Sequence, residues 1–164
     1  MANVQTDHPG PGTAQHWEIK QSGLIDITRM NAKAQNLKHE ELQPAGRALL
    51  VLIIEHVRTA GFRPGDPRTY LGYKECCVAL GVAPDEADLP WGRLLQQNGL
   101  NELNGWTQRN DFPRVTGLVV HQGGERQYWP GGDFFRSNHR PDMDGEWWEQ
   151  QALQAATFDW ESFL

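Results

Sequence analysis

The stretch PAGRALLVLIIEHVRTA, residues 44–60, predicts the clearest helix of the chain and the centre of its core. Its apolar residues recur at positions 45, 49, 52, 53, 57 and 60, which is the spacing of one helical face. Further apolar residues at 50, 51 and 54 widen that face, so we expect burial on more than one side. Pro44 suits the first turn, and Gly61 and Pro64 mark the end.

Three more helical segments are expected after this one. Residues 72–80 place four side chains on one helical face: Tyr73, Cys76, Cys77 and Leu80. Asp88 is a candidate N-cap for the next segment, which should be one kinked helix or two short ones because apolar residues lie on both sides of Gly99. Asp144 can cap a last helix, and the apolar residues of 158–164 should dock back onto the body.

The best strand is predicted at residues 115–121, which are rich in β-branched side chains. Gly123 and Gly124 allow a tight reversal, so residues 126–129 are expected to return as the partner strand. The sequence therefore predicts an α+β fold, with a helical bundle core and a small antiparallel β-hairpin. Residues 1–14 are expected to be a mobile tail, and residues 15–164 a single domain.

Composition places the chain among ordinary globular proteins. It has 164 residues, 38% of them apolar and 22% charged, and a formal net charge of −6. Cys76 and Cys77 are adjacent and supply no disulfide framework, which favours a reducing compartment. The sequence has no leader-like start and no apolar run of membrane-spanning length, so we expect a cytoplasmic protein without a membrane partner.

No complete catalytic or metal-binding motif is found. The six histidines, at positions 8, 16, 39, 56, 121 and 139, have no i, i+4 pair of the kind that binds a metal, and we expect no metal and no cofactor. The two cysteines are interpreted as small buried hydrophobic residues. The alternative is an enzyme with a dispersed site, drawn from Cys76 or Cys77 with His121, Asp133 and His139.

Acidic side chains and tryptophans gather near the C-terminus. Residues 129–164 carry seven acidic side chains, two basic ones and four of the seven tryptophans. Large aromatic side chains dominate many protein interfaces, so this region could bind a basic protein partner through Trp147, Trp148 and Trp160. The competing interpretation, which we favour, is that these tryptophans fill the core.

A resemblance covers the middle of the chain. The segments TYLGYKECCVALG, WGRLLQQN and FPRVTGLVVHQGG, within residues 69–132, resemble in order and spacing the winged-helix domain of alkylguanine-DNA alkyltransferases and alkyltransferase-like proteins. The resemblance implies a winged-helix-like centre and recognition of DNA by nucleotide flipping. The family's reactive motif, Pro-Cys-His-Arg-Val, is reduced here to Pro113-Arg114-Val115, so alkyl transfer is excluded on this alignment.

The leading hypothesis is accordingly a non-enzymatic recognition module that binds DNA. In the resemblance, Tyr73 would press on the DNA backbone and Arg93 would fill the space left by a flipped base. With neighbouring cations, the expected nucleic-acid contacts are Tyr73, Lys74, Arg93, Arg109 and Arg114. The alternative is a protein-binding adaptor or inhibitor that uses the acidic, tryptophan-rich region 129–164.

Overall fold

Helix α2 (Pro44–Ala60) has the bounds that the apolar pattern predicts, and it lies at the centre of the core. Leu49, Leu50, Ile53 and Ile54 are all buried, as expected for a helix with a wide apolar face. The computed structural model describes residues 40–83 and 89–164, so the predicted tail at 1–14, the start of the domain at residue 15 and the cap at Asp88 lie outside the described residues.

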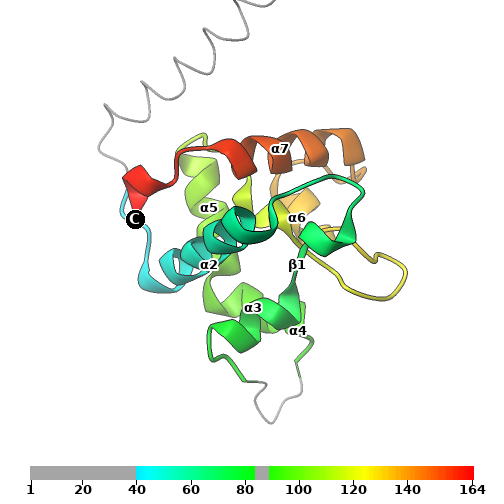
Figure 1. Ribbon diagram of the computed structural model, residues 1–164, viewed down its shortest axis with the longest axis horizontal. Helices are drawn as coiled ribbons and strands as arrows, with labels where there is room; N and C mark the ends of the chain where they lie inside the picture. The colour runs from blue at the N-terminus through cyan, green and yellow to red at the C-terminus, as the bar shows by residue number, and fades with distance from the viewer. Residues whose placement is uncertain (1–39, 84–88) are drawn as a thin grey trace, which may run out of the picture. The chain divides into compact units, whose positions relative to one another are not determined.

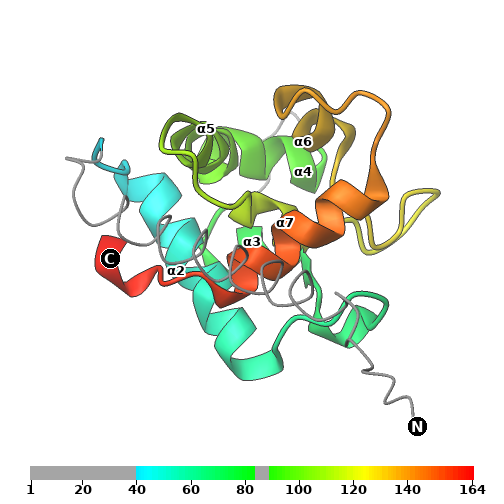
Figure 2. The same ribbon diagram turned by 90° about the horizontal axis from the view of Figure 1, so that it is seen from above.

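The remaining elements are short and mostly helical. In chain order they are η1 (Pro67–Thr69), β1 (Leu71–Gly72), α3 (Tyr73–Ala79), α4 (Trp91–Leu95), η2 (Gln96–Leu100), α5 (Asn101–Arg109), η3 (Val115–Leu118), β2 (Val119–Val120), α6 (Gly132–Ser137), α7 (Gly145–Thr157) and η4 (Glu161–Phe163). Figure 1 shows α7 along one side, α3 and α4 on the opposite side, and α2 and α5 between them, and Figure 2 gives the view from above. No helix in the described part of the chain is both long and apolar enough to cross a bilayer.

The interrupted helix around Gly99 is confirmed. Helix α4 continues through η2 into α5, but Asn98 (φ −114°, ψ 38°) and Gly99 (φ 122°) depart from helical geometry. The break lets α2 pass close by, since a Cβ built on Gly99 would lie only 2.6 Å from the carbonyl oxygen of Ala45. Asp144 caps α7 as predicted, accepting a hydrogen bond from the backbone N–H of Trp147 at 3.0 Å.

The predicted antiparallel hairpin is wrong. The two short strands pair in parallel, with Leu71 opposite Val119 and Gly72 opposite Val120. Residues 126–129 form no strand, although the chain does reverse there: the N–H of His121 donates to the carbonyl of Trp129 at 2.9 Å, and the N–H of Tyr128 donates to the carbonyl of His121 at 2.6 Å. Tyr128 has a φ of 66°, which ends any extended pairing.

Tertiary packing explains why residues 115–118 form the 3₁₀ turn η3 instead of a strand. The carbonyl of Gly117 accepts a hydrogen bond from the indole of Trp148 at 2.8 Å. A Cβ at Gly117 would come within 2.8 Å of the Phe134 ring, so the turn fits tightly between α6 and α7. These contacts outweigh the preference of β-branched residues for strands. The mixed α+β class is confirmed: among the described residues, helices predominate over one two-stranded sheet.

Candidate functional site

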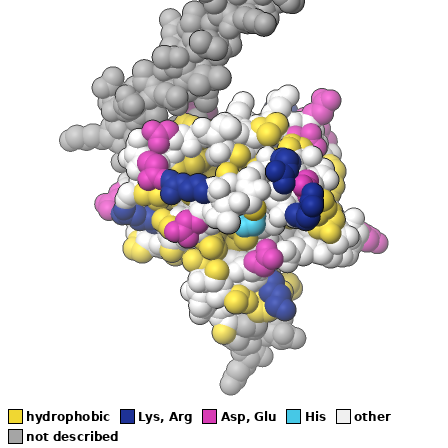
Figure 3. Space-filling view, viewed as in Figure 1, with side chains coloured by type: hydrophobic (Ala, Val, Ile, Leu, Met, Phe, Trp, Pro, Cys, Tyr) yellow, Lys and Arg dark blue, Asp and Glu magenta, His cyan; other side chains and the backbone are white. Residues whose placement is uncertain are grey.

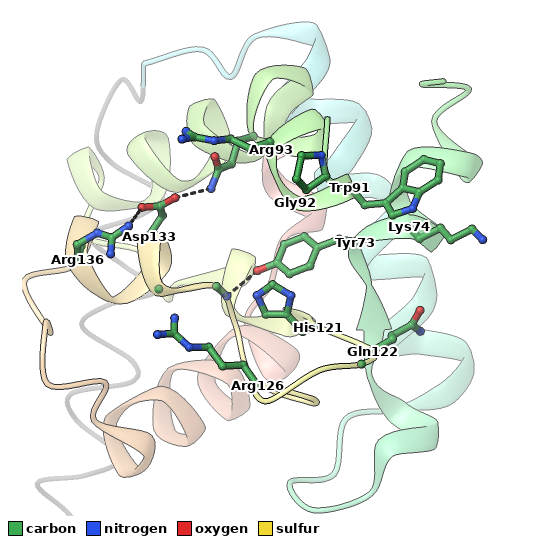
Figure 4. A pocket seen from close by; sticks show the side chains of 15 residues that line it. Tyr73, Lys74, Trp91, Gly92, Arg93, His121, Gln122, Arg126, Asp133 and Arg136 are labelled. Atoms are coloured by element: carbon green, nitrogen blue, oxygen red, sulfur yellow. Dashed lines mark hydrogen bonds and ion pairs between the residues drawn. The ribbon is translucent and has the colours of Figure 1, made fainter. Parts of the chain in front are cut away.

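A cavity of about 600 Å³ opens between α3, α4 and the segment that runs from the end of β2 into α6. A second cavity of about 360 Å³ adjoins it. Five residues line both: Tyr73, Gln96, Gly131, Asp133 and Arg136. Figure 4 shows the side chains of the larger cavity, which come from separate parts of the chain.

The parallel sheet positions the two residues at the centre of this cavity. Gly72 and Val120 are paired at the C-terminal ends of the two parallel strands. The residues that follow them, Tyr73 and His121, therefore lie at the same end of the sheet. Their rings meet edge to face with centroids 5.0 Å apart (Figure 4). The strand pairing that sequence reasoning missed is therefore the feature that assembles the site.

Tyr73 is one of the residues that line both cavities. Its hydroxyl oxygen accepts a hydrogen bond of 2.7 Å from the N–H of Gly131, and burial raises the pKa of the phenol to about 12. The hydroxyl consequently keeps its proton at neutral pH. That proton has no acceptor within residues 40–83 and 89–164, so it is available to a group that enters either cavity.

Cations outnumber anions along the larger cavity. Its described lining has one carboxylate, Asp133, and four basic side chains: Lys74, Arg93, Arg126 and Arg136. This balance contrasts with the net charge of −6 for the whole chain. It also contrasts with the face shown in Figure 3, where acidic and basic side chains are interspersed. The described lining therefore carries a local excess of positive charge, which favours an anionic group.

Asp133 orients part of the lining. It accepts a hydrogen bond of 2.9 Å from the Gln96 amide and pairs with the Arg136 guanidinium. The pKa of the Asp133 carboxyl is lowered, first by the hydrogen bond from Gln96 and then by that from Arg136. Asp133 is thus ionised at neutral pH, and it ties η2 to α6 across the cavity.

His121 and Trp91 add aromatic surface to the lining. Burial lowers the pKa of His121, and the positive charge of Arg126 lowers it further, so the imidazole is neutral at pH 7. The ammonium group of Lys74 lies 5.7 Å from the centroid of the Trp91 ring, within the range of a cation–π contact. Aromatic and cationic side chains therefore both line the cavity.

The residues predicted to contact nucleic acid divide into two groups. Tyr73, Lys74 and Arg93 line the larger cavity, whereas Arg109 and Arg114 line neither cavity. Arg109 forms an exposed ion pair with Glu40, with Nε and Oε2 2.7 Å apart.

Arg114 is partly buried and bonded inside the fold. Its guanidinium donates to Asn138 Oδ1 at 2.8 Å, to the carbonyl of Thr107 at 3.0 Å and to the carbonyl of Phe112. Burial lowers its pKa, though not enough to remove the charge of a guanidinium. Arg114 therefore holds α5, η3 and the end of α6 together and is not free to bind a phosphate.

The tryptophans assigned to a protein interface mostly lie in the core. Trp148 and Trp160 are each 4% exposed, and their indole N–H groups donate to the carbonyls of Gly117 and Ala155. Trp147 is half-buried and packs on Phe134, with ring centroids 5.7 Å apart. The favoured interpretation of core tryptophans thus describes Trp148 and Trp160.

The residues of the proposed dispersed enzyme site do not come together. His121 and Asp133 line the same cavity, but His139 lines neither cavity. Cys76 and Cys77 are fully buried, and burial raises the pKa of both thiols, which keeps them protonated and unreactive. In the described part of the chain, no group of three potential ligands is placed to hold a metal ion.

Several lining residues were not predicted from the sequence. Trp91, Gln96 and Arg136 line the cavity but were not among the expected contacts, although Trp91 and Gln96 lie in the segment WGRLLQQN of the resemblance. Arg126 belongs to the basic residues of the middle of the chain but not to the expected contacts. A lone Gln or Arg gives no signal by itself, because its role here depends on the contact between η2 and α6.

Comparisons with protein-family models, with curated proteins and with solved structures found no match for this chain.

Proposed function

We propose that the chain is a non-enzymatic recognition module that binds DNA at the larger cavity. The observation that carries the proposal is the lining itself, with four cations, one carboxylate, and the rings of Tyr73, Trp91 and His121. Cationic groups attract the phosphates of nucleic acids, and aromatic rings offer surfaces for exposed bases. The proposal includes the winged-helix-like centre that the resemblance implies, with α3 and α4 as its helical pair.

The arrangement of the cations supports this proposal. Lys74 and Arg93 come from two adjacent helices, and Arg126 comes from the loop on the other side of the opening. A chain that bridges this opening would meet positive charge on both sides. Within the described residues, neither Lys74, Arg93 nor Arg126 is paired with a carboxylate, so each can exchange water for a phosphate.

The test is a binding titration with fluorescently labelled single-stranded and duplex DNA at low salt. We expect binding that weakens steeply as salt increases, because each phosphate contact releases a counterion. Arg93→Ala should weaken binding about tenfold, the cost of one charge-assisted hydrogen bond. Arg109→Ala is the matched control, since it removes the same charge outside the cavity, and it should leave the affinity within about twofold.

Two results would contradict the proposal. One is the absence of any DNA binding at low salt by protein whose circular dichroism shows it to be folded. The other is an equal loss in Arg93→Ala and Arg109→Ala, because general charge attraction would then suffice and the cavity would have no role.

The adaptor hypothesis for residues 129–164 has weaker support. The acidic side chains of α7, Glu146 and Glu149, are exposed and could face a basic partner. Trp148 and Trp160, however, are not accessible as interface anchors. If the folded protein binds no DNA, this acidic face becomes the candidate binding surface.

A further inference from the structure

We propose that Arg126 and Arg136, which precede and follow Gly132 in the sequence, form a phosphate-binding site within the larger cavity. The inference deepens the proposed function and rests on it for the source of the phosphate, which is DNA. It assigns a defined contact to two arginines that sequence reasoning did not select as site residues.

The geometry around Gly132 brings the two guanidinium groups together. A Cβ built on Gly132 would lie 2.7 Å from Nη1 of Arg126 and 3.6 Å from Nη1 of Arg136. Because both nitrogens lie close to the same point, the two groups are near neighbours although they come from a loop and a helix. The lack of a side chain at Gly132 leaves room for this approach.

The charges at this point are not balanced by the described residues. Arg136 pairs with Asp133, but that carboxylate also accepts a hydrogen bond from Gln96. Arg126 forms no ion pair with a carboxylate in the described part of the chain. The carboxylate of Asp133 thus offsets the charge of Arg136 but not that of Arg126, and the repulsion between the two guanidinium groups is relieved when an anion binds between them.

Phosphate is the anion that fits these donors best. The planar fork of a guanidinium group presents paired N–H donors that match two oxygens of a phosphate. The cavity, at about 600 Å³, has room for a phosphate with its attached sugar. The phosphate could be an internal phosphodiester of a DNA strand or a terminal phosphate monoester, and the same two arginines would bind either.

His121 supplies a spectroscopic readout of binding. Its ring faces Tyr73 from α3, and the charge of Arg126 lowers its pKa. A phosphate bound at Arg126 would offset that charge and attract the imidazolium, so the pKa of His121 should rise. A purely structural role for Arg126 would produce no such response to phosphate.

The first experiment follows His121 by NMR while inorganic phosphate is added, with sodium chloride at equal ionic strength as the reference. We expect phosphate, but not chloride, to raise the pKa of His121. Arg126→Gln should weaken phosphate binding about tenfold or more. Arg140→Gln is the control, since the Arg140 guanidinium lies over the Trp147 ring, 5.3 Å from its centroid, and lines neither cavity. It should bind phosphate as the wild type does.

The inference is overturned if phosphate has no more effect than chloride. It is also overturned if Arg126→Gln and Arg140→Gln weaken phosphate binding equally, because a diffuse positive potential would then explain the binding. These outcomes leave the proposed function open, since the DNA titration with Arg93→Ala tests it separately.

A second experiment identifies the source of the phosphate. Oligonucleotides of one sequence, with and without a 5′-phosphate, are titrated against the wild type and Arg126→Gln. A preference for the phosphorylated strand that is lost in Arg126→Gln supports a terminal monoester, whereas equal weakening of both strands supports a phosphodiester. If Arg126→Gln changes neither affinity, the assignment to DNA is overturned. Phosphate binding without any DNA binding would instead overturn the proposed function.

Discussion

Arg93 and Arg114 show that two arginines can have different roles because they differ in burial. Arg93 lines an open cavity without an ion pair to any described carboxylate, while the guanidinium of Arg114 donates to Asn138, Thr107 and Phe112. A sequence shows both residues simply as cations near aromatic side chains. Their difference arises from the chain segments that fold around them.

Arg114→Met should destabilise the protein by about 2–4 kcal/mol. The methionine would fill part of the space but would remove the hydrogen bonds that the guanidinium donates to the carbonyls of Thr107 and Phe112. Chemical denaturation monitored by circular dichroism measures the change in the free energy of unfolding. A matched Arg109→Ala variant, which loses only an exposed ion pair, should change it by less than about 1 kcal/mol. Equal effects of the two substitutions would contradict the structural role of Arg114.

The path from α4 through η2 to α5 is the element on which the arrangement of the helices depends. Gly99 permits the break, and the backbone of α2 passes against it at Ala45. Gln96, one turn earlier, reaches Asp133 from the same segment. The break therefore allows α2 to pack closely, and it belongs to the same segment that contributes Gln96 to the cavity.

Gly99→Ala should cost about 3 kcal/mol or more of stability. It adds a Cβ that would lie 2.6 Å from a backbone oxygen, at a residue whose φ is 122°. Gly81→Ala provides the comparison, because Gly81 also has a positive φ, 69°, but an added Cβ there meets nothing within 4 Å. The latter should cost only about 1–2 kcal/mol, the strain of the left-handed conformation. Melting temperatures of the two variants test this difference, and similar values would show that close packing at Ala45 is unimportant.

Helices α2, α3, α4, α5 and α7 were predicted from the sequence because their signals are local, whereas the short helix α6 was not expected. The apolar period of α2, the glycine break and the Asp144 cap all lie within a few residues of the structure they determine. The strands were predicted poorly because each has only two residues and their partners are far apart in sequence. Residues 115–118 have strand-like composition, but the fit of Gly117 under Trp148 depends on a helix about thirty residues later.

At the scale of the whole molecule, the C-terminal residues contribute to the hydrophobic core. An aromatic cluster joins α5 to the residues after α7, through Trp106, Phe112, Phe158, Trp160 and Phe163. The expectation that residues 158–164 dock back onto the body is confirmed by these contacts. The acidic residues on the surface of the same segment do not prevent its inner side from being apolar.

Deletion of residues 142–164 should abolish cooperative unfolding. It would remove Trp148, Ala152, Ala155 and Trp160, all of them buried, and expose the surfaces they cover. Near-ultraviolet circular dichroism and a thermal melt would detect the loss of fixed aromatic packing. As a control, Leu153→Ala, which alters a side chain of α7 that is 44% exposed, should keep a cooperative transition. A truncated protein with a sharp melt would show instead that the segment is an appendage.

The site could be predicted only in part because its lining comes from several elements. Tyr73 and Arg93 were expected as contacts because of the resemblance to the winged-helix domain, and Lys74 as a neighbouring cation; all three line the cavity. Gln96 and Arg136 join them only because the Gln96 amide of η2 meets Asp133 of α6, next to Arg136. The sequence therefore identified part of the lining but not the contact between η2 and α6 that completes it.

The buried cysteines of α3 allow the rate at which this helix separates from its neighbours to be measured. Cys76 and Cys77 lie on the same short helix as Tyr73 and have no exposed surface. A thiol-reactive dye can label them only after this helix has separated from its neighbours, and labelling in native buffer therefore records how often the wall behind Tyr73 comes apart. A ligand bound in the cavity would stabilise the position of α3 and so lower the labelling rate. The labelling rate therefore also reports how much of the protein has ligand bound, without a label on the ligand.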